Sequence, residues 1–182
     1  MLYPNNNKKI YIKNINYANR GMKLESLIND ANHYYNTNNI ALIYKKPTPI
    51  TIGSVNYDKN GKVLTKGYFN TKSTLDYVGI YKGKYMDFDA KSTTSKTSFP
   101  LNNLQKHQLE HIEKVIKHGG ISFLIIEMNN IIYLLKGTDL ILFICNNKRK
   151  SIPYNYIKDN GFEIKLKYNP VLDYIKIIDK FY

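Results

Sequence analysis

Three charged side chains between residues 73 and 91 have the types and the spacing of a metal site that faces a phosphate. Asp76 is followed by twelve residues and then by Asp89, and Lys91 comes two positions later. Carboxylate oxygens are ligands that Mg2+ prefers, and a lysine ammonium binds phosphate. A charged strand exposed to solvent would show the same spacing, so the elements around these residues decide between the two interpretations.

The acidic residues are predicted to lie on an antiparallel hairpin. Strand-forming runs predict strands at 75–81 and 85–91, joined by a glycine-containing turn at 82–84. Side chains alternate between the faces of a strand, so Asp87, Asp89 and Lys91 point the same way. From the first strand, Asp76 reaches the same patch across the ladder, which gathers carboxylates and a lysine at one edge of a sheet.

Two amphipathic helices are predicted on either side of this hairpin. Residues 19–35 carry apolar side chains at helical spacing, and residues 102–118 form the clearest helix, which Gly119 and Gly120 end. Gln108 lies on the apolar face of the second helix, where an amide needs a buried partner. We therefore expect Gln108 to point into a polar site against the sheet.

A longer hairpin precedes the acidic one. Its strand-like runs and the turn between them occupy residues 50–57, 62–69 and 58–61. Prolines at positions 47 and 49 interrupt the chain at its base, so about residues 47–69 are predicted to project from the body as an arm. Tyr68 and Phe69 at its end either join the core, the commoner fate of aromatic residues, or stack on bases.

The other apolar runs complete a sheet and its covering helices. A buried strand is predicted at 40–45, two further strands at 121–126 and 131–135, and helices within 138–144 and 171–182. Strands and helices in this order predict an α/β fold.

His107 and His111 are four residues apart and raise the question of a zinc site. The metalloprotease pattern needs glutamate directly after the first histidine, and this chain has Gln108 there. We therefore reject a zinc site and expect both histidines at the surface or facing DNA.

The composition is that of one basic globular domain. The 182 residues are 43% hydrophobic and carry a formal net charge of +13, from 27 Lys and Arg against 14 Asp and Glu. This charge favours nucleic acid as a partner, although an AT-rich genome would also enrich lysine, asparagine, isoleucine and tyrosine. Residues 1–18 show no clean period and are predicted to be a flexible basic arm, followed by a single domain at 19–182.

The cysteine count and the hydropathy of the sequence indicate the cellular compartment of the protein. Cys145 is the only cysteine, so no disulfide forms within one chain and a reducing cytoplasm is expected. No apolar run approaches about 18 residues, and the first residues lack the apolar stretch of a signal peptide, so no membrane partner is expected. Glycine-rich phosphate loops do not occur, which argues against a nucleotide-driven enzyme.

Asp76, Asp89 and Lys91 fit the nuclease pattern PD-(D/E)xK, and longer blocks give a more specific resemblance. The chain resembles the RecU family of Holliday-junction resolvases, which has this pattern. The blocks follow one another along most of the chain: NRGMKLESLIN at 19–29, KKPTPI at 45–50, GYF at 67–69, STLDYVGIYKGKYMDFDAK at 73–91, TSFPLNNLQKHQ at 97–108 and HGGISFLII at 118–126.

The resemblance implies a restriction-endonuclease-like fold, with a mixed β-sheet flanked by helices and the hairpin at about residues 47–69 as a projecting stalk that enters the junction. It implies a homodimer that resolves four-way DNA junctions in recombination and repair, with a RecA-type recombinase as a possible partner. The residues similar to the family's magnesium ligands are Thr74, Asp76, Asp89 and Gln108, and Lys91 is similar to its transition-state stabiliser. Mn2+ is expected to substitute for Mg2+.

Arg20, Lys45, Lys46 and Phe69 are the expected DNA contacts. One departure bears on activity, because the family usually has glutamate where this chain has Asp89, a carboxylate shorter by about 1.5 Å. Mg2+ demands near-ideal octahedral geometry, so the strand must sit closer or water must fill the gap. The alternative function is a non-catalytic junction-binding or recombinase-regulating protein that retains the nuclease fold.

Overall fold

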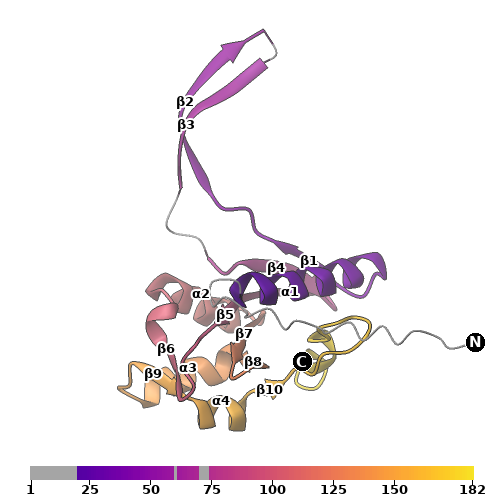
Figure 1. The fold of residues 1–182 in the computed structure, drawn as a ribbon, viewed down its shortest axis with the longest axis vertical. Coiled ribbons are helices and arrows are strands. Elements are labelled where there is room, and N and C mark those ends of the chain that lie inside the picture. Colours follow the sequence, from indigo (N-terminus) through magenta and orange to yellow (C-terminus); the bar gives the residue numbers. More distant parts are fainter. Residues whose placement is uncertain (1–19, 60, 70–73) are drawn as a thin grey trace, which may run out of the picture.

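A computed structural model of the chain describes residues 20–59, 61–69 and 74–182 (Figure 1). The side chains at positions 20–22, 58, 62–65 and 69 lie outside this description. The predicted basic arm at 1–18 therefore falls outside the described residues, as do the side chains of Arg20 and Phe69.

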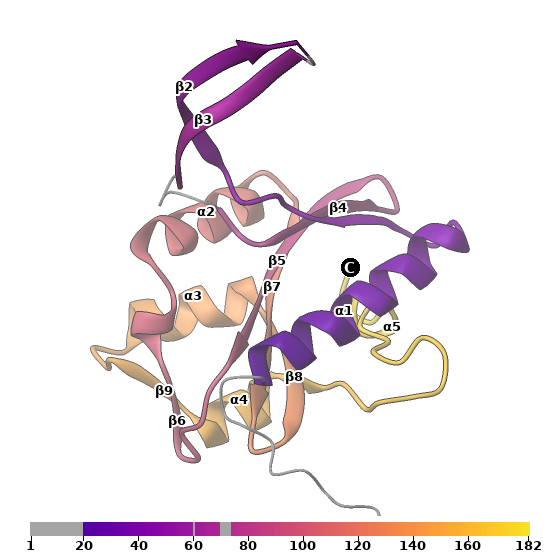
Figure 2. The ribbon, with the colours of Figure 1, turned by 45° about the horizontal axis from the view of Figure 1, so that its top comes forward.

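A six-stranded mixed sheet forms the centre of the molecule (Figures 1 and 2). In spatial order its strands are β1 (Leu42–Lys45), β4 (Tyr77–Tyr81), β5 (Lys84–Ser92), β7 (Ile121–Met128), β8 (Ile131–Lys136) and β10 (Phe162–Glu163). Neighbouring strands are antiparallel except β5 and β7, which are parallel. The predicted mixed sheet is confirmed.

A parallel pair of strands needs a crossover connection, and the chain between β5 and β7 supplies one. It consists of β6 (Ser98–Pro100), the 3-10 turn η2 (Leu101–Asn103) and α2 (Lys106–Lys117). The short strand β6 pairs with β9 (Ser151–Pro153) outside the main sheet. This crossover brings the amino-terminal half of α2 over the acidic strand β5.

Helices cover both faces of the sheet. One face packs against α1 (Arg20–Thr37) and the single-turn α5 (Ile175–Ile178), and the other against α2, α3 (Gly137–Asn146) and α4 (Tyr154–Asn160). Side chains of β7 alternate between the two cores, with Phe123 in the first and Leu124 in the second. Burial on both faces explains why β7 is apolar along almost its whole length.

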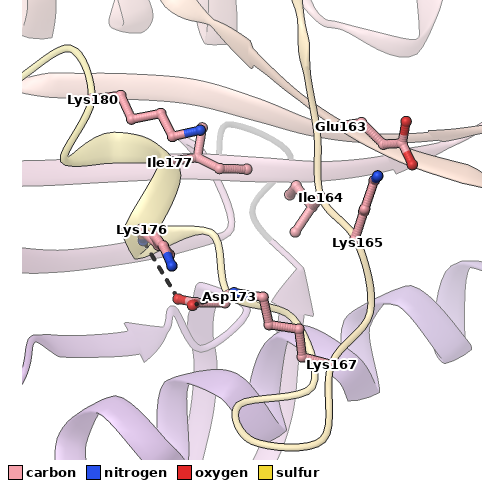
Figure 3. A pocket seen from close by; sticks show the side chains of 8 residues that line it. All are labelled: Glu163, Ile164, Lys165, Lys167, Asp173, Lys176, Ile177 and Lys180. Atoms are coloured by element: carbon pink, nitrogen blue, oxygen red, sulfur yellow. Dashed lines mark hydrogen bonds and ion pairs between the residues drawn. The ribbon is translucent and has the colours of Figure 1, made fainter.

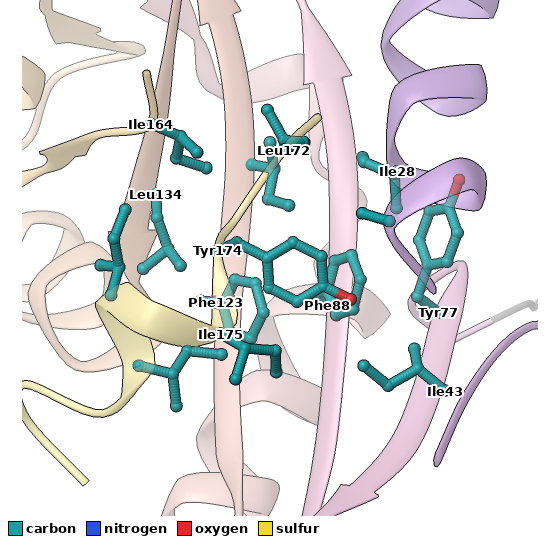
Figure 4. Close-up of a cluster of buried hydrophobic side chains, with 14 of the residues drawn as sticks. Ile28, Ile43, Tyr77, Phe88, Phe123, Leu134, Ile164, Leu172, Tyr174 and Ile175 are labelled. Carbon is teal, nitrogen blue, oxygen red and sulfur yellow. The ribbon is translucent and has the colours of Figure 1, made fainter. Parts of the chain in front are cut away.

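An aromatic stack fixes the back of the acidic strand (Figure 4). The ring centroid of Phe88 lies 4.7 Å from that of Tyr77 and 4.6 Å from that of Phe123, with nearly parallel planes. Tyr174, from the carboxyl-terminal segment, packs against the ring of Phe88 at 5.2 Å. Phe88 points away from Asp87 and Asp89, so this packing holds β5 in place while its other face carries the carboxylates.

The long hairpin projects from the body as predicted. β2 (Ile50–Asp58) and β3 (Gly61–Phe69) pair only with each other among the described strands and rise away from the main sheet (Figures 1 and 2). Tyr68 is 61% exposed, so its ring does not join the core. We refer to residues 47–69 as the stalk.

Two predicted elements differ from the structure. β1 was expected to be a buried strand, but it forms the edge of the sheet, and of its apolar side chains only Ile43 is buried. The run at 171–182 was expected to be a helix, but only α5 is helical within it. Apolar residues occur on all sides of that run, and it packs as an irregular segment in which the carbonyl of Leu172 accepts a hydrogen bond from Tyr35.

None of the described helices is both long and apolar enough to span a membrane. The longest is α1, and polar and charged residues interrupt its apolar stripe.

Candidate active site

Asp89 lies at the centre of a polar cluster between β5 and α2. Its side chain is fully buried, and its Oδ2 accepts hydrogen bonds from Gln108 Nε2 and Lys91 Nζ, both at 2.9 Å. Within the described part of the chain, its Oδ1 has no hydrogen-bond partner. A buried carboxylate oxygen without a donor is costly, so this atom marks a place that suits a cation.

The amino terminus of α2 positions Gln108. The side chain of Gln105 accepts a hydrogen bond from the backbone N–H of Gln108, and Gln108 Oε1 accepts one from the backbone N–H of Gln105 at 3.1 Å. This reciprocal cap turns the amide nitrogen of Gln108 toward Asp89 and, over 3.5 Å, toward the carbonyl of Thr74. The predicted inward direction of Gln108 is confirmed, since only 8% of the residue is exposed.

Asp76 immediately precedes β4 rather than lying on that strand. Tyr77 pairs with Phe88 in the ladder, so Asp76 and Asp89 come next to one another at its end. Burial raises the pKa of Asp89 from 3.8 to about 6, the charge of Lys91 opposes this shift, and Asp76 raises the pKa further through its charge and a hydrogen bond. The expected gathering of Asp76, Asp89 and Lys91 at one place is therefore confirmed.

Lys46 also points into this cluster. Its Nζ donates a hydrogen bond to Thr74 Oγ1 at 2.7 Å, and its backbone N–H donates to the carbonyl of Asp76 at 2.7 Å. Burial lowers the pKa of Lys46, while the nearby charges of Asp87, Asp76 and Asp89 act in the opposite direction. Lys46 therefore lies half-buried beside the carboxylates instead of extending into solvent.

A second buried carboxylate, Asp87, lies two residues before Asp89 on the same face of β5. It accepts a hydrogen bond from Ser122 Oγ at 2.8 Å, contacts His111 Nε2 and receives a long hydrogen bond of 3.4 Å from the Tyr85 hydroxyl. The expectation that His111 is simply a surface or DNA-facing residue is wrong, because its ring is tied to a fully buried acid.

The pairing of Asp87 with His111 has a weak signal in the sequence. His111 follows Gln108 by three residues and so lies on the same side of α2, and Asp87 precedes Asp89 by two residues on the same face of β5. Only the docking of the helix on the strand shows that the two pairs meet.

The structure describes the side chains of two of the four residues predicted to contact DNA, and these two lie in different surroundings. Lys45 Nζ forms an ion pair with Glu25 of α1 at 2.5 Å on the surface of the domain, and both side chains are exposed by about two fifths. Lys46 points into the acidic cluster, and the side chains of Arg20 and Phe69 lie outside the described residues.

The donor set of the cluster fits a divalent cation that prefers oxygen. In the described ranges no three side chains of the His, Cys, Asp and Glu types converge on one point. Asp76 and Asp89 supply carboxylates, Asp89 Oδ1 is available, and the hydroxyl of Thr74 lies at the same edge. Gln108 presents its amide nitrogen to Asp89 in this arrangement, so it orients the carboxylate here.

Comparison with known proteins assigns the family. The model of the family described as Recombination protein U matches residues 19–180. The chain belongs to the RecU family. It is 46% identical to the Holliday junction resolvase RecU of Geobacillus sp. (strain WCH70), with 97% of this chain and 90% of that protein covered. It is 43% identical to the Holliday junction resolvase RecU of Bacillus mycoides (strain KBAB4), over 99% of this chain and 97% of that one.

A distant structural likeness accompanies this family match. The structure of Archaeoglobus fulgidus Hjc, a Holliday junction resolvase from an archaeal hyperthermophile, aligns with a TM-score of 0.44 and 10% sequence identity, covering 79% of this chain and 91% of that chain.

A surface pocket lies elsewhere in this RecU-family chain, beside the carboxyl-terminal segment (Figure 3). Its charged lining residues are Glu163, Lys165, Lys167, Asp173, Lys176 and Lys180. Lys167 forms an ion pair with Asp173 at 3.1 Å, and none of the acidic residues of the β5 cluster takes part. This pocket is therefore separate from the acidic cluster at β5 and α2.

Proposed function

We propose that the chain is a structure-specific endonuclease that resolves four-way DNA junctions by metal-dependent hydrolysis of phosphodiesters. The observation that carries this proposal is the geometry of Asp89, a buried carboxylate with one oxygen held by Gln108 and Lys91 and the other oxygen unpartnered in the described structure. Relatives named Holliday junction resolvase, at above 40% identity over nearly the whole chain, support the substrate.

Asp76, Asp89 and Thr74 would hold Mg2+ or Mn2+, and Gln108 would hold Asp89 in position. The bound ion would lower the pKa of an attacking water and stabilise charge on the phosphate. Lys91 lies on the same face of β5 and would stabilise the negative charge that grows on the phosphate in the transition state. Because the Lys91 ammonium lies 2.9 Å from Asp89 Oδ2, it already sits beside the carboxylate that would bind the ion.

The position of Asp89 matters because its side chain is shorter than the glutamate that is usual in the family. Gln108 reaches Asp89 from the capped first turn of α2, and the aromatic stack behind Phe88 holds β5 against further movement. This support from both sides favours a working site over a non-catalytic one.

The stalk and the edge of the sheet supply the remaining parts of the proposal. The stalk projects from the body (Figure 1), and we propose that it enters the opening of a four-way junction and discriminates it from linear duplex. Leu42, Tyr44 and Ile80 are exposed on one face of the β1–β4 edge, with Leu42 directly opposite Ile80. We propose that this edge patch contacts a second copy, since two symmetric sites are needed to nick two strands of a junction.

The test uses a synthetic four-way junction with Mg2+ or Mn2+. The wild-type chain is expected to produce paired nicks at symmetric positions, and Asp76→Asn and Lys91→Ala should abolish them while junction binding in Ca2+ persists. Asp159→Asn is a matched control, because Asp159 is exposed on α4 and takes no part in the acidic cluster.

The outcome also separates the enzyme from the alternative. Junction binding without nicks at any metal concentration would contradict the catalytic proposal and support a junction-binding protein. Equal cleavage of junction and linear duplex would keep the nuclease and reject the junction specificity.

A further inference from the structure

A pocket of about 300 Å³ lies between β5 and the carboxyl-terminal half of α2. It is lined by Tyr85, His111, Lys114, Val115, His118 and Gly120. We call it the α2–β5 pocket. It contains none of the residues proposed to hold the metal or to contact the reacting atoms.

The α2–β5 pocket lies next to the acidic cluster, farther along β5 toward the amino terminus of that strand. Along β5, every second residue faces α2, and along α2 the corresponding residues lie about one turn apart. Gln108 meets Asp89, and His111 meets Asp87, so the next position on β5 is Tyr85, at the wall of the pocket. Four residues of β-strand span about 13 Å, which places the pocket that far from Asp89 along the strand.

The polar side chains that line the pocket are Tyr85, His111, Lys114 and His118, beside the apolar Val115. Lys114 lies in the last turn of α2 and His118 caps the carboxyl end of this helix, and both residues are exposed. Asp87 is the nearest acid, and Ser122, His111 and Tyr85 already engage its two oxygens. The other acids of α2 face elsewhere, since Glu110 pairs with Lys106 at 3.6 Å and Glu113 lines a different, apolar pocket.

We propose that the α2–β5 pocket binds a backbone phosphate of the DNA strand that is cut, at a position other than the scissile one. This inference rests on the proposed nuclease function and adds a second anchor point for the strand. Lys114 Nζ and the ring of His118 are the donors, and Asp87 holds the His111 ring at the wall between the pocket and the catalytic cluster. On one strand of a duplex the helical rotation adds to the rise of about 3.4 Å per nucleotide, so a distance of about 13 Å between phosphates corresponds to roughly two nucleotides from the cut.

The first experiment compares Lys114→Gln with Lys117→Gln. Both lysines are exposed on α2 and both variants lose one positive charge, but Lys117 does not line the pocket. Binding of the wild-type chain and both variants to an intact junction is measured in Ca2+ across a range of salt concentrations. Lys114→Gln should weaken binding by up to roughly fivefold at low salt and reduce the slope of log K against log salt by about one. Lys117→Gln should leave the slope unchanged.

A second experiment locates the phosphate. Junctions are prepared with a single neutral methylphosphonate at successive positions on the cut strand. One position, roughly two nucleotides from the cut, should weaken binding by wild type and by Lys117→Gln but not by Lys114→Gln, because that variant has already lost the contact.

The results distinguish failure of the pocket from failure of the proposed function. If wild type binds and cleaves junctions but the two lysine variants share the same salt slope, or if no methylphosphonate position separates them, the pocket is not a phosphate site. If wild type neither binds nor cleaves junctions, the nuclease proposal falls and the pocket proposal falls with it.

Discussion

Lys46 Nζ donates a hydrogen bond to Thr74 Oγ1 over 2.7 Å, and this contact joins the two ends of the stalk beside the acidic cluster. Lys46 immediately precedes the stalk and Thr74 follows it, so the base of the stalk and the catalytic residues share one polar network. A displacement of the stalk on a junction would therefore shift Lys46 and Thr74 relative to the carboxylates.

Replacing Lys46 should tighten binding of a divalent cation. In the metal-free chain the Lys46 ammonium lies near Asp76, Asp87 and Asp89, and it repels a second cation there. Lys46→Met is expected to lower the Kd for Mn2+, measured by titration calorimetry without DNA, by roughly tenfold. Lys45→Met is the control, because Lys45 pairs with Glu25 on the surface. Equal Mn2+ affinity in both variants would show that Lys46 does not compete with the metal.

Removing the charge of Asp89 should stabilise the metal-free chain. Burial raises the pKa of Asp89 from 3.8 to about 6, so the folded state holds its proton more tightly than the unfolded state does. The resulting cost in stability appears as pH rises from about 4 to about 6 and is fully present at pH 7, where it amounts to roughly 1–3 kcal/mol. Asp89→Asn should therefore melt at higher temperature than wild type at pH 7 in EDTA.

The same experiment has an internal check. At pH 4 the advantage of Asp89→Asn should largely disappear, because wild-type Asp89 is then protonated in the folded chain. A melting temperature of Asp89→Asn below that of wild type at pH 7 would mean that the ion pair with Lys91 outweighs the burial of the carboxylate.

The rate of junction cleavage should decrease as the pH falls through about 6. A protonated Asp89 cannot bind the metal, and its raised pKa places this loss nearer to neutral pH than an ordinary aspartate would. Lys91 lowers the pKa of Asp89, so Lys91→Met should move the loss of Mn2+ binding to a higher pH than in wild type. Metal affinity measured against pH, with Asp159→Asn as the control, tests this expectation.

Shortening the stalk should remove the choice of junctions. The hairpin pairs only with itself among the described strands, so replacing residues 50–66 by a short glycine-serine linker leaves the main sheet intact. The shortened chain should bind junction and linear duplex with similar affinity in a competition assay, and its melting temperature should stay near that of wild type. Unchanged preference for junctions after this deletion would count against a role for the stalk in recognition.

A charge on the edge patch should separate the proposed dimer. Leu42 and Tyr44 are 48% and 54% exposed on β1, and Ile80 lies beside them on β4. Leu42→Lys places a cation in this patch and is expected to shift the mass measured by light scattering from two chains to one. Leu142→Lys is the matched control, because Leu142 is 57% exposed on α3. A dimer that survives Leu42→Lys and not Leu142→Lys would place the contact on α3.

Much of the fold followed from local patterns in the sequence. The period of apolar residues predicted α1 and α2, strand-forming runs around a glycine-containing turn predicted the acidic hairpin, and prolines beside two further strand-forming runs predicted the stalk. These features depend on neighbours in the chain, which is why the sequence shows them. The inward direction of Gln108 was also predictable, because an amide on an apolar helix face must find a partner.

Only the tertiary structure decided what surrounds the acidic cluster. Lys46 and His111 are basic residues that the sequence places at the surface, yet Lys46 bonds Thr74 beside the acidic cluster and His111 contacts Asp87, because β1 lies beside β4 and α2 docks on β5. The edge position of β1 and the irregular end of the chain likewise depend on which elements lie next to them in space. Charge and periodicity along the sequence determined which residues carry chemistry, whereas contacts between distant elements determined which of them face one another.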